Sequence, residues 1–90
     1  MKDDHTKAID NYSKAIALDA TNPDAYMHRA EAHEDDDNDD FAAADYTRAI
    51  ALDPANRDLY TSRYAVQIRR RRFLATLADF WRGMKLILAE

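Results

Sequence analysis

The chain repeats itself with a period of 34 residues, and this repetition limits the folds that it can adopt. The segments Ala8–Arg29 and Ala42–Arg63 are identical at 11 of their 22 aligned positions. A fixed period of this length is typical of proteins in which one small unit of secondary structure is stacked on the next. We therefore expect residues 1–90 to form one domain of about two and a half stacked units.

Each unit is predicted to be helical. Ala42, Tyr46 and Ala49 are spaced four and three residues apart, so a helix places them on one face as a small, a large and a small side chain. With 1 glycine and 2 prolines in the chain, few residues interrupt such helices. The repetition and the spacing together favour an all-α fold.

Short segments rich in Asn, Asp and Pro mark where the helices begin and end. Pro54 disfavours a helical Asp53 and ends a helix there. Asn22 before Pro23 is suited to cap the next helix, and Asn56 takes the same place one unit later. These signals predict five helices, near residues 4–19, 23–35, 40–53, 57–69 and 73–89.

The pattern resembles the tetratricopeptide repeat (TPR) family. Its second-helix motif is matched by Ala42, Tyr46, Ala49 and Pro54, and its first-helix motif more loosely by Tyr26, Arg29, Ala30 and His33. The resemblance implies antiparallel helical hairpins stacked as a short right-handed solenoid, with a half repeat at 4–20, a full repeat at 22–54 and a divergent repeat at 56–89. The chain would thus open with the second helix of a repeat.

Three departures from the family pattern stand out. Arg29 occupies a position where leucine is usual, and the turn at Asp37 and Asn38 contains no glycine. In the last unit Thr76, Phe80 and Gly83 only approximate the small, aromatic and small series.

In such proteins the first helix of each hairpin lines a concave surface. The resemblance implies a peptide groove lined by Asp24, Met27, His28, Glu31 and Glu34, and then by Asp58, Thr61, Ser62, Ala65 and Ile68. The acids on this surface imply that a bound peptide would be basic and extended.

The acidic segment Glu34–Asp40 offers an alternative function. Asp35, Asp37 and Asp39 match the start of a calcium-binding loop, but Asp40 and Tyr46 stand where such a loop needs glycine and glutamate. We expect a solvated turn between two helices, and a cation-responsive module is the alternative. The three histidines, His5, His28 and His33, form no convincing metal-ligand pattern.

Charge is divided unequally along the chain. Residues 1–45 contain 13 acids and 4 bases, a net charge of −9, whereas residues 46–90 contain 4 acids and 9 bases, a net charge of +5. The run Arg69–Arg72 is predicted to be a helix end and a tight turn with its guanidinium groups in water. An acidic partner suits this run better than nucleic acid does.

The last predicted helix has more apolar surface than a terminal helix should expose. Phe73, Thr76, Phe80, Gly83 and Ile87 form one stripe, which we expect to pack on the preceding helix. A second stripe is available for self-association: Leu74, Leu77, Trp81, Met84 and Leu88.

The first predicted helix also presents apolar residues for self-association, namely Ile9, Tyr12 and Ile16. The sequence therefore predicts association of two copies. Either two last helices pair across a two-fold axis, or the acidic front of one copy meets the basic back of another head-to-tail, and a closed homodimer is the commoner outcome. A third route is a helix-swapped oligomer, because "QIRRRRFLATL" consists of good helix formers and its two flanking helices could fuse.

No catalytic constellation, cofactor motif or membrane-spanning segment is present in the sequence. A non-catalytic protein-interaction module, cytoplasmic by default and binding a protein partner or itself, is the predicted function.

Overall fold

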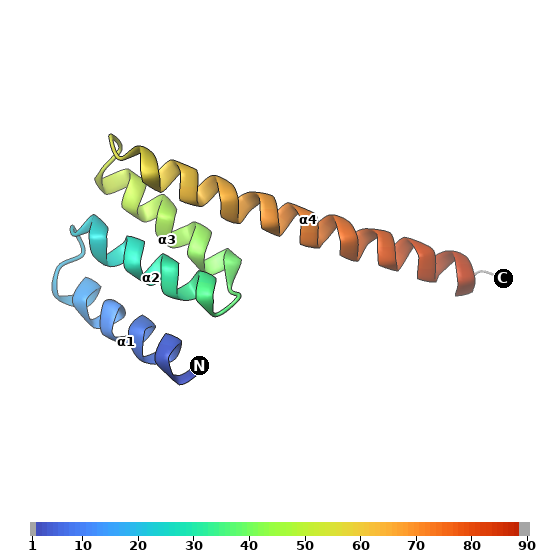
Figure 1. Cartoon of the computed structure of the whole chain (residues 1–90), viewed down its shortest axis with the longest axis horizontal. Coiled ribbons are helices and arrows are strands. Elements are labelled where there is room, and N and C mark those ends of the chain that lie inside the picture. The colour runs from blue at the N-terminus through green and yellow to red at the C-terminus, as the bar shows by residue number, and fades with distance from the viewer. Residues whose placement is uncertain (1, 89–90) are drawn as a thin grey trace.

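The computed structural model describes residues 2–88, with side chains from Asp4 to Lys85. These residues form four helices and no strand: α1 Lys2–Leu18, α2 Pro23–Asp35, α3 Asp39–Leu52 and α4 Arg57–Leu88. Each helix packs on the one before it, so the helices stack in chain order (Figure 1). The prediction of an all-α helical repeat is confirmed.

The stack is held by one core that runs through all the interfaces. Ala42, Tyr46 and Ala49 are buried on α3, as their spacing predicts. Tyr26 and Ala30 of α2 pack on one side of the same cluster, and Leu59 and Val66 of α4 belong to its other side. Alanine at these positions lets the helix backbones approach closely, which is why the unit can stack.

Asparagine side chains begin two of the helices, as the sequence predicts. Asn22 accepts a hydrogen bond from the backbone N–H of Asp24 at 3.0 Å, with Pro23 in the first turn of α2. Asn56 accepts the equivalent bond from Asp58 at 3.1 Å at the start of α4. Each cap satisfies a backbone donor that has no partner inside the helix.

The turn between α2 and α3 depends on a residue in the left-handed region. Asp37 has φ 56°, a conformation that Asp tolerates better than most residues with a side chain. Its N–H donates to the carbonyl of Glu34 at 3.0 Å, and the N–H of Asn38 donates to that of His33 at 2.8 Å. This pair of bonds is the Schellman motif, which ends α2 and reverses the chain.

The fourth and fifth predicted helices are a single helix, so the expected turn at Arg69–Arg72 is wrong and the expected count of five is one too many. One period after the turn residues Asp36, Asp37 and Asn38, the chain has Arg70, Arg71 and Arg72. Arginine is a good helix former and seldom adopts positive φ, so these residues continue the helix.

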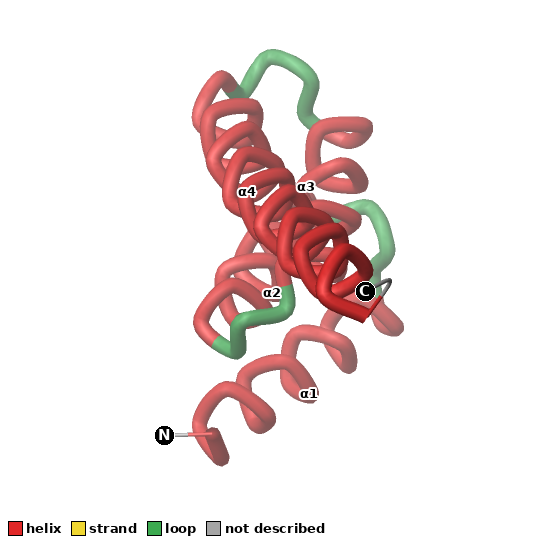
Figure 2. The backbone as a smooth tube through the Cα atoms, turned by 90° about the vertical axis from the view of Figure 1, so that its right-hand side faces the viewer, coloured by secondary structure: helices red, strands yellow, loops and turns green. Residues whose placement is uncertain are grey.

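With 32 residues, α4 is about 48 Å long and extends well past the other helices. The molecule measures 57 × 32 × 18 Å, and the longest dimension follows α4. Figure 2, viewed from the C-terminal side, shows this helix projecting from the stack toward the viewer.

Candidate functional site: the projecting half of α4

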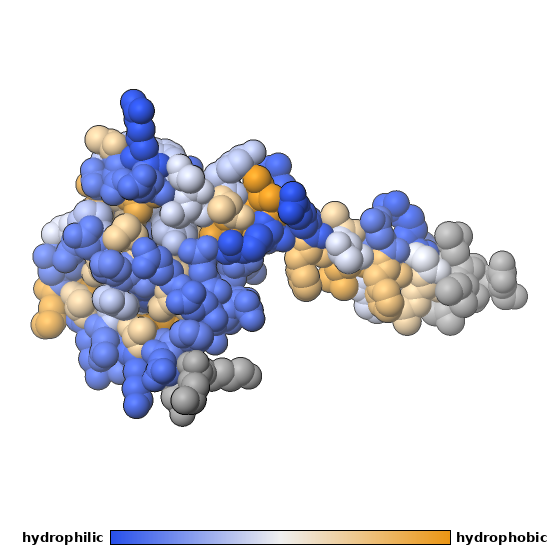
Figure 3. Space-filling model, in the orientation of Figure 1, coloured by the Kyte–Doolittle hydropathy of each residue, from blue (hydrophilic) through white to orange (hydrophobic). Residues whose placement is uncertain are grey.

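The side chains of α4 change from buried to exposed along the helix. Leu59 and Val66 are buried against α3, whereas every side chain from Arg69 to Lys85 is exposed. Figure 3 shows apolar residues along this projecting part, beyond the polar body of the stack. We call residues 69–85 the projecting segment.

The apolar side chains of the projecting segment share one half of the helix circumference. Phe73 is 67% exposed and Trp81 is 59% exposed, and Phe80 meets Trp81 edge to face with ring centroids 6.3 Å apart. The remaining members of this surface are Leu74, Leu77 and Met84. A continuous apolar surface of this kind on a soluble domain usually marks an interface.

One stripe was expected to pack on the preceding helix, and this expectation is wrong. Phe73, Thr76, Phe80 and Gly83 are exposed, because the helix that carries them continues straight instead of folding back. Leu88 ends α4, and its side chain, like that of Ile87, lies outside the described side chains.

The residues of α1 that are predicted to take part in self-association are less exposed to solvent than those of the projecting segment. Tyr12 stacks on His28 of α2 with ring centroids 5.4 Å apart, and Ile16 packs against the core. Ile9 is half-buried as well. The larger exposed apolar surface therefore lies on α4.

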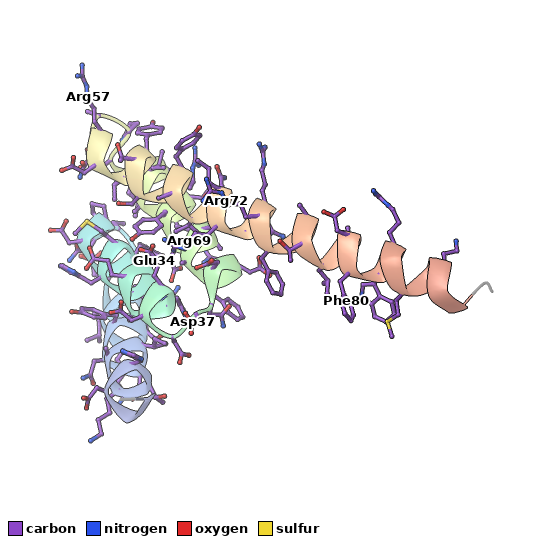
Figure 4. The ribbon with its side chains drawn as sticks, turned by 45° about the vertical axis from the view of Figure 1, so that its right-hand side comes forward. Glu34, Asp37, Arg57, Arg69, Arg72 and Phe80 are labelled. Atoms are coloured by element: carbon purple, nitrogen blue, oxygen red, sulfur yellow. The ribbon has the colours of Figure 1, made fainter. Side chains whose placement is uncertain are left out.

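Ion pairs fix α4 where it leaves the stack. Arg69 Nη2 lies 2.7 Å from Glu34 Oε1 and 3.2 Å from Asp39 Oδ1, and Arg70 Nε lies 2.6 Å from Asp40 Oδ1. Hydrogen bonds to Asp39 and Glu34 raise the pKa of Arg69 above its usual value. These two arginines are therefore paired, not simply solvated as the sequence suggested. Figure 4 labels Arg69 on α4 beside Glu34.

A cleft of about 450 Å³ lies beside these ion pairs. Its walls come from the α2–α3 turn and from α4, and Figure 4 labels Glu34 and Asp37 on the first wall and Arg69 on the second. The full lining is Glu34, Asp37, Asn38, Asp39, Asp40, Arg69, Arg70, Phe73 and Leu74.

The acidic segment forms the predicted turn between two helices. Three of its carboxylates, on Glu34, Asp39 and Asp40, are engaged by arginines of α4. Among the described residues, no group of three or more His, Asp or Glu side chains is arranged to hold a metal ion.

The residues of the expected peptide groove lie along α2 and the first half of α4. Asp24 and Glu31 are exposed, Met27 packs against the core, and His28 Nδ1 lies 3.6 Å from Glu31 Oε2. On α4, Ser62 and Ile68 are half-buried, and the other expected members, Asp58, Thr61 and Ala65, are exposed.

A buried carboxylate that the sequence analysis did not identify lies at the centre of the stack. Asp45 on α3 is 1% exposed and accepts two hydrogen bonds from Arg29 of α2, at 2.7 and 2.8 Å. Arg48 adds a third at 2.9 Å. Arg29, which replaces the usual leucine, therefore has a structural partner. The recurrence of arginine one period later, at Arg63, is the sequence signal that could have identified this role.

His33 borders this carboxylate. Its Nε2 lies 3.7 Å from Asp45 Oδ2, and its buried Nδ1 has no hydrogen-bond partner. Burial lowers the pKa of His33, an effect that Asp45 opposes and Arg29 reinforces. The imidazole is therefore held in its neutral form near pH 7.

A second, shallower depression lies on the first half of α4. It measures about 420 Å³ and is lined by Tyr60, Thr61, Arg63, Tyr64 and Gln67. We call these residues the tyrosine face. The stacked hairpins, the alanine-lined crossings and the exposed helix faces together define a helical-repeat protein whose surfaces, rather than an enclosed pocket, are available for binding.

Comparison with known protein families supports the resemblance to this repeat. Residues 2–37, which include α1, α2 and the start of the following turn, match the family described as TPR repeat, so this part of the chain is similar to a tetratricopeptide repeat. TPR repeats mediate protein–protein interactions. No curated protein matches the chain. Among the described residues, no helix is long and apolar enough to cross a membrane.

Proposed function

We propose that this chain is a non-catalytic protein-interaction module that associates with itself through the projecting segment of α4. The observation that carries the proposal is the continuous apolar surface from Phe73 to Met84, which no other part of the described chain covers. Burying large apolar side chains contributes about 1.5–3 kcal/mol each, so a second copy has a strong driving force to cover them.

Charge supports pairing between copies. The half of the sequence up to residue 45 has a net charge of −9, and the remainder has a net charge of +5. Opposite charges at the two ends of the chain orient an approaching copy and speed its association. The apolar surface provides the affinity, and the charge division favours an antiparallel or head-to-tail approach.

The solution mass tests this function directly. Light scattering is expected to give a mass above the 10.4 kDa of one chain at a concentration of about 100 µM. A double change, Leu77→Glu with Trp81→Glu, is expected to return the mass to 10.4 kDa, because it places two carboxylates in the interface.

A matched control separates the site from general charge effects. Leu18 is an exposed leucine at the C-terminal end of α1, so Leu18→Glu changes charge and hydropathy without altering α4. Its mass is expected to equal that of the wild type. A wild-type chain that remains a monomer throughout a concentration series would contradict the proposed self-association.

A further inference from the structure

The projecting segment has the sequence of a second repeat helix. Shifting by 34 residues aligns α3 with residues 73–86, and places Asp79 on Asp45 and Arg82 on Arg48. The local ion pair is also repeated: Arg48 pairs with Asp45 at 2.9 Å, and Arg82 pairs with Asp79 at 3.7 Å.

The first half of α4 has the sequence and contacts of α2, the first helix of the hairpin. Arg29 Nη1 donates to Ser13 at 3.1 Å, and Arg63 Nη1 donates to Thr47, one period later, at 3.3 Å. Both arginines also lie over a tyrosine ring, at 5.7 Å from the centroid in each case. Residues 57–69 are therefore prepared to receive a second helix.

Within one chain, residues 73–85 do not pack on residues 57–69, because both belong to the same straight helix. Arg29 reaches Asp45 because the turn at Asp37 brings α3 back along α2. Arg63 and Asp79 lie 16 residues apart on one straight helix, which separates them by about 24 Å along its axis. The carboxylate of Asp79 is consequently exposed instead of buried.

The tyrosine face is the surface left open by this separation. Tyr26 on α2 is 9% exposed under α3, but its counterpart Tyr60 is 41% exposed. Tyr64 and Gln67 stand where Ala30 and His33 face α3, and both are exposed in the depression on α4. The depression lies on the face where the second helix of this repeat would pack.

We propose that two copies exchange helices, so that residues 73–85 of each copy pack on residues 57–69 of the other. This inference rests on the proposed self-association and specifies its geometry. Arg63 and Asp79 each lie eight residues from Arg71. When two α4 helices pair antiparallel about Arg71, each Arg63 therefore lies opposite Asp79 of the second copy, and the buried pair of the first repeat forms twice.

The sizes of the side chains at the crossing agree with this pairing. Ala30 and Ala49 belong to the same buried cluster in the first repeat. In the second repeat their counterparts are Tyr64 and Gly83. In an antiparallel pair centred on Arg71, Tyr64 lies at the level of the small Ala78 of the second copy, and Gly83 lies at the level of Leu59. Nothing lies within 4 Å of a Cβ added at Gly83 in the single chain. A glycine in an exposed helix costs about 1 kcal/mol relative to alanine, and exchange gives it a packing role.

The hinge explains why the copies exchange instead of closing on themselves. A closed hairpin needs positive φ at Arg71, the counterpart of Asp37, and an N-cap at Arg72, the counterpart of Asn38. Arginine suits neither position, whereas a continuous helix suits both residues. Exchange lets residues 73–85 of one copy contact residues 57–69 of the other, while the hinge residues Arg71 and Arg72 remain helical.

Mixing two charge variants tests the exchange. Asp79→Arg places two arginines together at both sites of an exchanged dimer, and Arg63→Asp places two aspartates together. Each variant alone is therefore expected to associate at least tenfold more weakly than the wild type. In a mixture, each site of the mixed dimer contains one arginine and one aspartate, so association is expected to recover. Light scattering and circular dichroism of the separate and mixed chains measure the effect.

Asp10→Arg is the control, because Asp10 is exposed on α1 and pairs with Lys14 there. Alone, this variant is expected to keep the wild-type mass. In a mixture with Arg63→Asp, it is expected not to restore the association of the Arg63→Asp chain. If Asp79→Arg and Arg63→Asp lose helicity alone, recovery of helicity on mixing supports the exchange equally. Absence of recovery overturns it. A wild-type monomer would instead overturn the self-association on which the exchange rests.

Discussion

The guanidinium group of Arg29 on α2 donates two hydrogen bonds to the carboxylate of Asp45 on α3, from Nε at 2.7 Å and from Nη2 at 2.8 Å. The remaining nitrogen, Nη1, donates to Ser13 of α1 at 3.1 Å. One arginine therefore joins three consecutive helices. The two-pronged geometry fixes the relative position of the helices as well as attracting opposite charges.

Removing the carboxylate of this pair is expected to destabilise the fold. Asp45→Ala leaves Arg29 partly buried without a charged partner, which costs about 3–5 kcal/mol in comparable buried pairs. Urea unfolding followed by circular dichroism measures the loss. Arg48→Ala removes the more exposed partner and is expected to cost less than about 1 kcal/mol.

A double variant separates the lost attraction from the unpaired charge. In Arg29→Leu with Asp45→Ala no buried charge is left unpaired, since Arg48, the remaining partner of Asp45, is largely exposed. Leucine is the usual residue at the corresponding position of tetratricopeptide repeats. This variant is expected to be more stable than Asp45→Ala alone. Equal losses for Asp45→Ala and Arg48→Ala would contradict a dominant role for the Arg29–Asp45 pair.

The pH dependence of stability should depend partly on His33. Its pKa is lowered in the fold, first by burial, while Asp45 and Asp36 oppose the shift and Arg29 reinforces it. The unfolded chain therefore binds a proton more readily, and stability falls as the pH drops through the unfolded histidine value of about 6.5. For one proton the slope is at most about 1.4 kcal/mol per pH unit.

Thermal unfolding between pH 7.5 and 5.5 checks this expectation. His33→Gln cannot take up the proton, so its melting temperature is expected to change less over this range than that of the wild type. His28 is the matched control, because it stacks on Tyr12 at the surface between α1 and α2. His28→Gln is expected to keep the wild-type pH dependence in this comparison. Parallel curves for His33→Gln and the wild type would contradict the expectation.

The turn between α2 and α3 gives a third prediction. Asp37 has φ 56°, whereas the neighbouring Asp36 has φ −92°. A β-branched residue fits positive φ poorly, so Asp37→Val is expected to cost about 1–2 kcal/mol. Asp37→Gly relieves the backbone and is expected to equal or exceed wild-type stability. Asp36→Val is the control, with a smaller loss. Equal effects of valine at 36 and 37 would contradict the backbone explanation.

The first repeat could be predicted from the sequence because each of its signals is local. Asn22 caps α2, Pro54 follows the end of α3, and Ala42, Tyr46 and Ala49 are buried as their spacing indicates. Each of these effects depends on neighbours within a few residues, so the sequence alone is enough to find it.

The turn predicted at Arg69–Arg72 is wrong because a repeat period alone does not make a turn; the residues at that place must also suit one. The period places a turn there, but the residues that make the first turn, Asp37 and Asn38, are replaced by Arg71 and Arg72. The ion pairs of Arg69 with Glu34 and Asp39 join residues more than 29 positions apart, and no local pattern identifies them. The same is true of the partners that Arg29 finds on α1 and α3.

Gly83 provides a test of the exchanged crossing that does not involve charge. In the single chain there is open space around this residue, so Gly83→Leu produces no clash and is expected to strengthen the helix. In the exchanged dimer the leucine takes the position in the second repeat that the fully buried Ala49 has in the first, where it keeps the helices apart. The expected result is a lower mass by light scattering with undiminished helicity. Gly83→Ala, which matches the first repeat, should retain the wild-type mass, and an equal mass for the leucine variant would contradict the crossing.

The hinge gives the last prediction. Arg71→Gly with Arg72→Asn supplies the positive φ and the N-cap that the first hairpin has at Asp37 and Asn38. With this turn available, residues 73–85 can fold back on residues 57–69 of their own chain. The expected mass is then that of one chain, 10.4 kDa, with most of the helical signal retained.

The control for the hinge removes the same two charges and keeps the helix. Arg71→Ala with Arg72→Ala also relieves repulsion between arginines near the two-fold axis, but alanine favours a continuous α4. This variant is expected to associate at least as strongly as the wild type. If the glycine–asparagine and alanine variants have the same mass, then turn chemistry at Arg71 and Arg72 does not decide between an open and a closed second repeat.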